Sequence, residues 1–321
     1  MKKLLVLVLL FSLVAVIFVG CNETPTTTPT YTVMTPDGAP SMAIAKMMMD
    51  NNQFGRKAKY SIIGSEAVSA SFTNGDADFI IAPSNAGVML SNKLGTYKMV
   101  AVTSWGNLFV VGSNTYKALS ECADVSEFMQ QFAGKEIASI GTNLVPDKTF
   151  KHILTTANVN ATLTASTAPL IQSDLKDGKI EFGILGEPAV TATLMNATNA
   201  KRLCSVSEIW KQVVGTEFTQ AGLFVKKSII ENDKAAVESF ISELKASIDF
   251  LNASADNAKS LGNYMESTGK STLKGAVVSK CYLQMSQKFV MAADVKDDVL
   301  AFVKVLGVNV AVDADIFYTA K

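Results

Sequence analysis

The feature that most constrains the fold is the alternation of short apolar runs with amphipathic stretches from residue 31 onward. The apolar runs are rich in β-branched and aromatic residues, which is typical of buried strands, and helix-period stretches follow most of them. This alternation favours an α/β architecture. The strand candidates of the first series are 31–35, 60–64, 78–82, 99–103 and 108–112.

A second series of strand candidates follows the first and predicts a second sheet of similar size. No spacer rich in Pro and Gly separates the two series, so we expect two lobes joined by chain crossings near 111–116 and 218–224. The first lobe is then formed by 31–112 together with 222–321, and the second by 113–221. The second series comprises strands at 136–140, 161–165, 182–186 and 201–206, with helices at 148–156, 169–176 and 188–195.

Beyond the strand candidate 221–225 the pattern becomes helical only. Apolar residues recur at steps of three and four from Val237 to Leu251, and Asn232 or Asp233 is placed to cap that helix. A block of helices without strands has to pack on a structure already built, and we expect it to cover the first lobe. Further helical stretches lie at 257–266, 273–281 and 295–306.

The N-terminal segment predicts export. Lys2 and Lys3 precede an apolar run from 4 to 19, which is typical of a secretory signal, with a transmembrane anchor as the alternative. The end of the run, Gly20-Cys21, resembles bacterial lipoprotein signals, in which a cysteine after a small residue is lipidated and becomes the first mature residue. That resemblance implies a signal peptide over 1–20, lipidation of Cys21 and an extracytoplasmic body anchored to the cell membrane. The polar Thr/Pro tract that completes 21–30 reads as a flexible tether.

Charge and cysteine content exclude several classes of protein. With 29 Lys and Arg against 29 Asp and Glu, the chain lacks the basic excess of a nucleic-acid-binding protein. Beyond Cys21, the three remaining cysteines Cys122, Cys204 and Cys281 match no zinc pattern. We expect them to be small buried residues, and one disulfide is the alternative in an oxidising compartment.

The sequence gives little support for an enzyme. His152 is the single histidine and lies in a helical segment, where a packing or surface role is expected. The chain has no G-x-S-x-G elbow, no phosphate-binding P-loop and no dinucleotide fingerprint, so we expect no catalytic residues, no cofactor and no metal. The run Met47 to Met49 is expected to pack in the core, not to bind copper.

Small-residue loops without Lys or Arg follow most of the strand candidates. In open α/β sheets ligands bind beyond the carboxyl ends of the strands, where helix N-termini present unpaired N–H groups. Taken singly, each loop is better explained as a turn or a helix cap; taken together, the loops predict a ligand-binding edge. The candidate ligand-binding residues are Asp37, Gly38, Ser41, Ser65, Ser84, Asn85, Trp105, Gly106, Asn107, Gly141, Thr142 and Glu187.

Three stretches carry a resemblance to a known family. They are DGAPSMAIAKMM, SEAVSASFTNGDADFIIAPSNAGVML, and ILGEPAV after LKDGKIEFG. They resemble the solute-binding proteins of bacterial ABC importers, in the group that serves nitrate, sulfonates, taurine and thiamine-pyrimidine precursors. The resemblance implies a two-lobed type II periplasmic-binding-protein fold with two mixed sheets flanked by helices and a hinge between them. It also implies a monomer that holds a small ligand between its lobes and delivers it to permease and ATPase subunits.

The loop residues suggest the chemistry of the ligand. Trp105 offers a stacking face, and Asp37, Glu66 and Glu187 offer acceptors for N–H or ammonium groups. This set suits a nitrogen heterocycle such as a thiamine pyrimidine precursor, with a small sulfonate or nitrate-type anion as the other expectation. Two alternatives to transport remain: an enzyme related to pyrimidine-precursor synthases on the same fold, which relies on histidine and cysteine, and a sensory lipoprotein.

Overall fold

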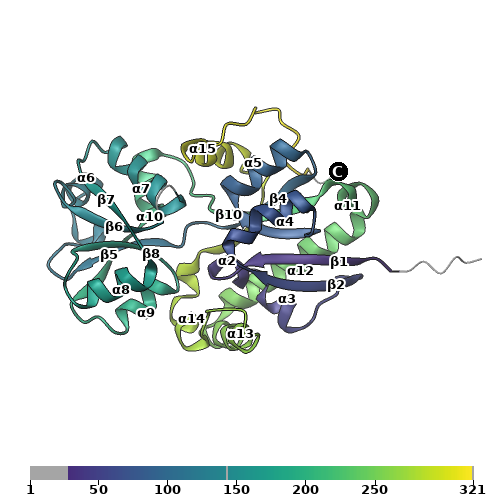
Figure 1. The fold of residues 1–321 in the computed structure, drawn as a ribbon, viewed down its shortest axis with the longest axis horizontal. Helices are drawn as coiled ribbons and strands as arrows, with labels where there is room; N and C mark the ends of the chain where they lie inside the picture. The colour runs from purple at the N-terminus through teal and green to yellow at the C-terminus, as the bar shows by residue number, and fades with distance from the viewer. Residues whose placement is uncertain (1–27, 142–143, 320–321) are drawn as a thin grey trace, which may run out of the picture.

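A computed structural model describes residues 28–141 and 144–319 of the chain. In this part of the chain the strands form two mixed sheets, each flanked by helices, so that two lobes lie side by side (Figure 1). The α/β architecture and the two sheets predicted from the sequence are confirmed. The signal segment, Cys21, most of the tether and Thr142 lie outside the described residues.

The first sheet has the strand order β11-β4-β10-β3-β1-β2. β1 is parallel to β2 and β3, whereas β10 is antiparallel to both of its neighbours, β3 and β4. Its strands are β1 (Thr30–Pro36), β2 (Lys57–Ile63), β3 (Phe79–Pro83), β4 (Tyr97–Ser104), β10 (Ala221–Lys226) and β11 (Gln287–Met291).

The second sheet, with the order β7-β6-β8-β5-β9, repeats this plan. β6 is parallel to β7 and β8, and β5 is antiparallel to its neighbours β8 and β9. In each sheet the strand that arrives from the other lobe, β10 or β5, is therefore antiparallel to both of its neighbours, and in the first sheet β11 is also antiparallel to β4. The strands are β5 (Leu108–Ser113), β6 (Glu136–Ile140), β7 (Thr162–Ser166), β8 (Phe182–Gly186) and β9 (Ala200–Ser205).

Helices cover both faces of each sheet (Figure 1). The first lobe carries α2 (Ala39–Met42), α3 (Ala45–Met49), η1 (Ser65–Ala67), α4 (Val68–Asn74), α5 (Ser84–Leu94), α11 (Lys227–Asn232), α12 (Lys234–Ala253) and α13 (Ala255–Ser267). The second carries η2 (Leu119–Glu121), α6 (Val125–Gln130), α7 (Val145–Thr156), α8 (Ala168–Lys176), α9 (Ala189–Leu194) and α10 (Val206–Val214). The C-terminal part adds α14 (Gly275–Cys281), η3 (Leu283–Met285) and α15 (Lys296–Val305).

The chain passes between the sheets at 105–107 and at 215–220. The first passage lies before residue 112, where we expected the first lobe to end. β5 pairs with β8 and β9, so this strand belongs to the second sheet. The sequence therefore located this strand but assigned it to the wrong lobe, because an apolar run carries no mark of the sheet that it joins. The second passage overlaps the expected crossing at 218–224.

The C-terminal part departs from the sequence expectation in two ways. The pattern beyond 225 was expected to be helical only, but β11 adds an edge strand whose irregular pairing with β4 leaves no clear alternation in the sequence. α12 and α13 cover the first lobe as expected, whereas α14 contacts α9 and α15 contacts both α5 and α7. These two helices lie on opposite sides of the crossing strands in Figure 1 and bridge the lobes.

An apolar core continues from one lobe to the other through α15. The ring of Phe302 lies 5.5 Å from Trp210 and 4.7 Å from Phe218, between centroids. His152 packs against Trp210 with centroids 5.6 Å apart, which confirms its packing role. The C-terminal helix therefore stabilises the second crossing.

The remaining core assignments are simple. Met47 and Met48 are buried, as expected. Cys204 and Cys281 are buried free thiols and Cys122 is a half-buried one, so the alternative of a disulfide among these three cysteines is wrong. Over 28–141 and 144–319, no helix combines the length and apolar character that crossing a membrane requires.

Candidate functional site

The two crossings meet at Gln220, which joins elements of both lobes. The backbone N–H of Ser84 donates to the Gln220 carbonyl (2.9 Å), and the backbone N–H of Asn107 donates to Gln220 Oε1 (2.9 Å). The backbone N–H of Gln220 in turn donates to the Ser104 carbonyl at 3.0 Å. We call the group Ser84, Asn85, Asn107, Thr219 and Gln220 the cleft floor.

Local sequence explains why Ser84 and Asn85 lie at the cleft floor. The apolar run of β3 ends at Pro83, and Ser84 begins α5 with no side-chain cap. The first turn of a helix leaves its backbone N–H groups without intrahelical partners. The Ser84 N–H donates to the Gln220 carbonyl, so β3 delivers the remaining N–H groups of this turn to the space between the lobes.

Four side-chain oxygens of the cleft floor are buried and have no hydrogen-bond partner among the described residues: Ser84 Oγ, Asn85 Oδ1, Asn107 Oδ1 and Thr219 Oγ1. Ser84 and Thr219 are 0% exposed and Asn107 is 7% exposed. A buried polar atom without a partner costs about 1–3 kcal/mol, so such atoms are rare and scattered in ordinary cores. Ten such side-chain atoms occur among the described residues, and these four belong to the residues around Gln220, which makes the cleft floor a candidate site for a partner from outside the chain.

Asp37 lies next to α2, but its carboxylate is occupied by the protein. It accepts hydrogen bonds from Ser271 Oγ (2.6 Å), from the Thr272 backbone N–H (2.8 Å) and from Thr272 Oγ1 (2.7 Å). Burial acts to raise the pKa of Asp37, but these donors outweigh burial and lower it. Ser41 Oγ similarly donates to the carbonyl of Gly38 (2.8 Å) and closes the first turn of α2.

Trp105 is half-buried and holds the first crossing against the C-terminal part. Its indole N–H donates to the Lys288 carbonyl (2.9 Å), and its backbone N–H donates to the Ser286 carbonyl (3.0 Å). The Lys288 ammonium lies 5.5 Å from the centre of the indole ring. Gly106 follows with φ 99°, and a Cβ there would lie 2.6 Å from Ser207 Cβ, so the crossing requires glycine.

Ser65 and Gly141 lie in other loops of the candidate set. Ser65 is an exposed residue of η1. Gly141, with φ 72°, donates its backbone N–H to the Ser166 carbonyl at 3.4 Å, in the loop that precedes α7. The contacts thus bring Ser84, Asn85 and Asn107 together at the cleft floor, with Trp105 and Gly106 in the adjoining crossing.

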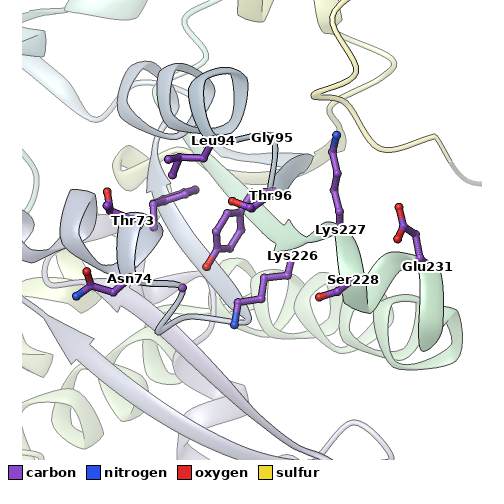
Figure 2. A pocket seen from close by; sticks show the side chains of 12 residues that line it. Thr73, Asn74, Leu94, Gly95, Thr96, Lys226, Lys227, Ser228 and Glu231 are labelled. Carbon is purple, nitrogen blue, oxygen red and sulfur yellow. The ribbon is translucent and has the colours of Figure 1, made fainter.

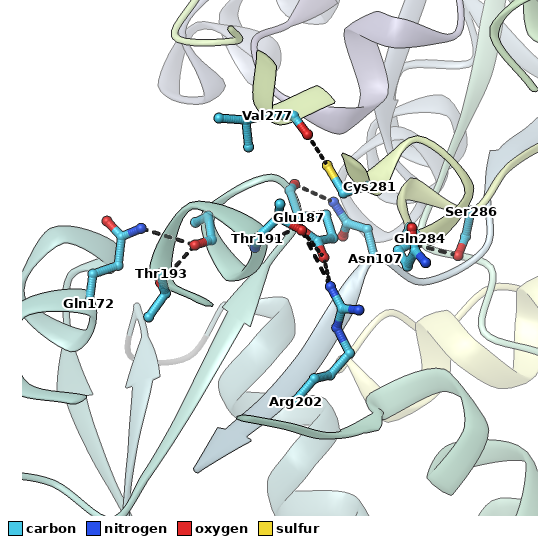
Figure 3. Close-up of polar contacts among 11 residues, drawn as sticks. Asn107, Gln172, Glu187, Thr191, Thr193, Arg202, Val277, Cys281, Gln284 and Ser286 are labelled. Atoms are coloured by element: carbon cyan, nitrogen blue, oxygen red, sulfur yellow. Dashed lines mark hydrogen bonds and ion pairs between the residues drawn. The ribbon is translucent and has the colours of Figure 1, made fainter. Parts of the chain in front are cut away.

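Glu187 is 3% exposed and lies where β8 meets α9 (Figure 3). Its carboxylate accepts hydrogen bonds from the backbone N–H and from Oγ1 of Thr191, each at 3.0 Å, and forms an ion pair with Arg202. Its backbone carbonyl accepts from Asn107 Nδ2 (3.3 Å). Glu187 is therefore joined to the cleft floor through its backbone, while its carboxylate is committed to Thr191 and Arg202.

Sequence reasoning missed Arg202, because only the loops were searched for cationic residues. Arg202 comes from β9 and its guanidinium stacks 4.6 Å from the ring centre of Phe109. The basic pair Lys201-Arg202 at the start of a strand candidate was the available signal. Cys281 of α14 lies beside Glu187, and burial together with that carboxylate raises the pKa of the thiol to about 12.

A separate hollow of about 660 Å³ lies at the opposite end of the first lobe, between the ends of α4 and α5 and the start of α11 (Figure 2). β10 runs from the cleft floor at Ala221 to this hollow at Lys226, so the strand separates the two places. Lys226 pairs with Asp78 at 2.8 Å and Lys227 with Asp315 at 3.1 Å. Over the described ranges, no group of three or more His, Cys, Asp or Glu residues is placed to hold a metal ion.

Solved structures with the same arrangement identify the class of fold. An ABC transporter from Parabacteroides distasonis superposes with a TM-score of 0.70 at 18% identity, over 86% of this chain and 91% of that chain. The periplasmic aliphatic sulphonate binding protein SsuA from Escherichia coli gives 0.65 at 11% identity, over 87% and 86%. The periplasmic nitrate-binding protein NrtA from Synechocystis PCC 6803 gives 0.55 at 12% identity, over 82% and 74%.

The chain therefore has the type II periplasmic-binding-protein fold, which is the fold that the sequence resemblance implied. Its solved structural neighbours include binding proteins of the sulfonate and nitrate type, which matches the group named in that resemblance. No protein-family model matches the chain, and no curated protein matches its sequence significantly.

Proposed function

We propose that this protein is the substrate-binding component of an ABC transporter and captures a small solute between its two lobes. The observation that carries the proposal is the cluster of four buried, unpartnered oxygens at the point where both crossings meet. A ligand held there contacts both lobes, so binding energy is available to favour a closed arrangement of the lobes. The fold shared with the sulfonate- and nitrate-type binding proteins supports the same function.

The proposal includes the cellular setting. The body is extracytoplasmic, monomeric and anchored through lipid on Cys21, and it delivers its ligand to permease and ATPase subunits. The ligand is a nitrogen heterocycle such as a thiamine pyrimidine precursor, or a small sulfonate or nitrate-type anion. Lipid anchoring rests on the sequence of the N-terminal segment, with Gly20 before Cys21 and a polar tether after it.

A thermal-shift screen tests ligand capture. The soluble body from Thr26 is melted with inorganic anions, amino-sulfonates and nitrogen heterocycles. A ligand at 100 times its Kd adds about 2.7 kcal/mol to the free energy of unfolding, which raises the melting temperature clearly. A body that responds to none of these solutes in the screen, and that carries no small molecule when purified from its own cells, would contradict a transport function.

Membrane anchoring is tested separately with the full chain. Cys21→Ser should release the protein into the soluble fraction and abolish labelling by radioactive palmitate. Cys122→Ser is the control, since Cys122 is a half-buried thiol of the folded body. Equal labelling of both variants would overturn lipidation of Cys21.

A further inference from the structure

We propose that Glu187 is a positioning residue that joins the cleft floor to a contact between the two lobes, and that this contact opens when a solute enters. The contact consists of Glu187, Thr191 and Arg202 from the second lobe and Cys281 of α14, and we call it the latch (Figure 3). The inference rests on the proposed function, because it concerns how a solute reaches the cleft floor. It does not depend on which solute is captured.

The latch connects the lobes because α14 is held closely on the first one. α14 packs on α13 so tightly that a Cβ on Gly275 would lie 2.1 Å from Asn263 Oδ1, and a Cβ on Gly262 would lie 2.7 Å from the Gly275 Cα atom. Both glycines permit this close approach. α14 then places Cys281, which is 0% exposed, against the start of α9 in the second lobe. Separation of the lobes on this side therefore has to break the latch.

Entry of a solute requires the lobes to separate. Ser84 and Thr219 of the cleft floor are 0% exposed in the present arrangement, so a solute reaches them only after the lobes move. Besides the two crossings, the lobes are joined by α15 on one side and by α14 on the other (Figure 1). The side that opens is the side where less contact is broken.

The two sides differ in what holds them. On one side Phe302 of α15 is buried in the apolar core that continues through both lobes, and the Lys148 ammonium of α7 donates to the Leu306 carbonyl at 2.8 Å. On the other side two short helices meet, and α9, with the sequence AVTATL, offers no charged side chain to α14. Opening on the α14 side thus requires less free energy, and α15 stays with the crossings as part of the hinge.

Glu187 joins the latch to the cleft floor. Its backbone carbonyl accepts a hydrogen bond from Asn107 Nδ2 at 3.3 Å. Its side chain is 0% exposed, accepts two hydrogen bonds from Thr191 at 3.0 Å each and forms an ion pair with Arg202. A buried carboxylate is stable only while its partners stay in place. Movement of α14 away from Glu187 admits water to this carboxylate and so disturbs the residue that holds the Asn107 amide.

Native thiols test whether the latch opens. The full chain, purified in mild detergent without added solute, is treated with N-ethylmaleimide, and peptide mass spectrometry follows each cysteine. Cys281 and Cys204 are both buried free thiols, so Cys204 in the second lobe is the control. We expect Cys281 to react at least about tenfold faster, which corresponds to an opening free energy about 1.4 kcal/mol lower. A rate for Cys281 equal to or below that for Cys204 would overturn the latch.

A disulfide across the latch tests whether this opening gives access to the cleft floor. Thr191 lies beside Cys281, so Thr191→Cys should cross-link the lobes when the chain is oxidised with diamide, and dithiothreitol should reverse the cross-link. Hydrogen–deuterium exchange of the Ser84 and Asn107 backbone N–H groups should then be slower in the oxidised form than in the reduced form.

Thr193→Cys is the matched control for the cross-link. Thr193 is also a buried threonine of α9, but its hydroxyl donates to the Ala189 carbonyl at 2.7 Å, on the side of the helix that faces Gln172 (Figure 3). It should neither cross-link to Cys281 nor change the exchange. A Thr191→Cys chain that does not cross-link, or that exchanges equally fast after cross-linking, would refute the proposal and leave solute capture to the thermal-shift screen.

The role of Glu187 itself is tested by Glu187→Gln, which keeps an acceptor oxygen and removes the charge that pairs with Arg202. Labelling of Cys281 and exchange of the Asn107 N–H should both become about tenfold faster, a change of about 1.4 kcal/mol. Glu181→Gln, which removes the carboxylate of an exposed ion pair in the same lobe, should change neither rate. Equal results for the two variants would show that Glu187 does not position the floor. The cross-link test keeps the native ion pair, so it decides the matter even where Glu187→Gln does not fold.

Discussion

At the scale of single residues, charged and uncharged candidates have different roles. Asp37 and Glu187, which the sequence offered as ligand acceptors, hold protein segments together, whereas the uncharged Ser84, Asn85 and Asn107 keep unpartnered oxygens. The sequence could not separate these roles, since the partner Ser271 lies 234 residues from Asp37. Residue type and position after a strand indicated the candidate residues, but only the long-range contacts determine which of their acceptors remain available.

Asp233 gives a residue-scale prediction about pH. It caps α12 and accepts two hydrogen bonds from the Arg56 guanidinium at 2.6 and 2.7 Å, and one from the Tyr31 hydroxyl at 2.7 Å. The Arg56 guanidinium, opposed by burial and assisted by Tyr31, lowers the pKa of Asp233 to about 2. Because the folded pKa lies below the unfolded one, this stabilisation is complete above about pH 4 and is lost as the pH falls toward 2.

The measurement is urea unfolding of the wild type and Asp233→Asn. Asparagine still caps a helix, so the variant removes the ion pair and leaves the cap. At pH 7 it should lower the free energy of unfolding by about 1–2 kcal/mol, a figure reduced for solvent screening, and the difference should vanish near pH 2. Asp294→Asn, at an exposed carboxylate, is the control. A loss that does not depend on pH would contradict the role of this ion pair.

At the scale of elements, the sequence predicted the strands from Thr30 to Lys226 and failed at β11. The central strands β3, β4, β5, β8 and β10 are nearly continuous buried apolar runs, whereas the predicted edge strands β2 and β7 are partly exposed. β11 is an edge strand with half-exposed residues and a shifted register, so no comparable signal exists. The bridging roles of α14 and α15 were also missed, because helix periodicity reveals a buried face but not the element that covers it.

α15 gives the prediction at this scale. Phe302 is fully buried against Trp210 and Phe218, so Phe302→Ala should lower the free energy of unfolding by about 3–5 kcal/mol. Val312→Ala, at a side chain that is 67% exposed in the same C-terminal region, should change it by less than about 0.5 kcal/mol. Chemical denaturation followed by tryptophan fluorescence compares the two variants. Similar losses for both variants would mean that α15 does not stabilise the second crossing.

At the scale of the whole molecule, the alternating pattern and the short loop motifs were enough to predict the fold. The relation between the lobes was not predictable, since it depends on 105–107 and 215–220, where the sequence has neither periodicity nor a spacer. The structure places at these crossings a positive-φ glycine, the Trp105 anchor and the Gln220 hydrogen bonds. The arrangement of the lobes should therefore respond to small changes there and not to similar changes elsewhere.

Gly106 allows that expectation to be tested. Gly106→Ala introduces both an unfavourable backbone conformation, φ 99°, and a contact of 2.6 Å with Ser207 Cβ across the first crossing. Gly134→Ala is a matched control, because Gly134 has φ 73° but no atom within 4 Å of an added Cβ. Both variants should lose about 1 kcal/mol to backbone strain, and Gly106→Ala should lose more and push the lobes apart. Small-angle X-ray scattering should then give a larger radius of gyration for Gly106→Ala than for Gly134→Ala or the wild type. Identical scattering and identical melting temperatures for the two variants would show that this crossing does not set the position of the lobes.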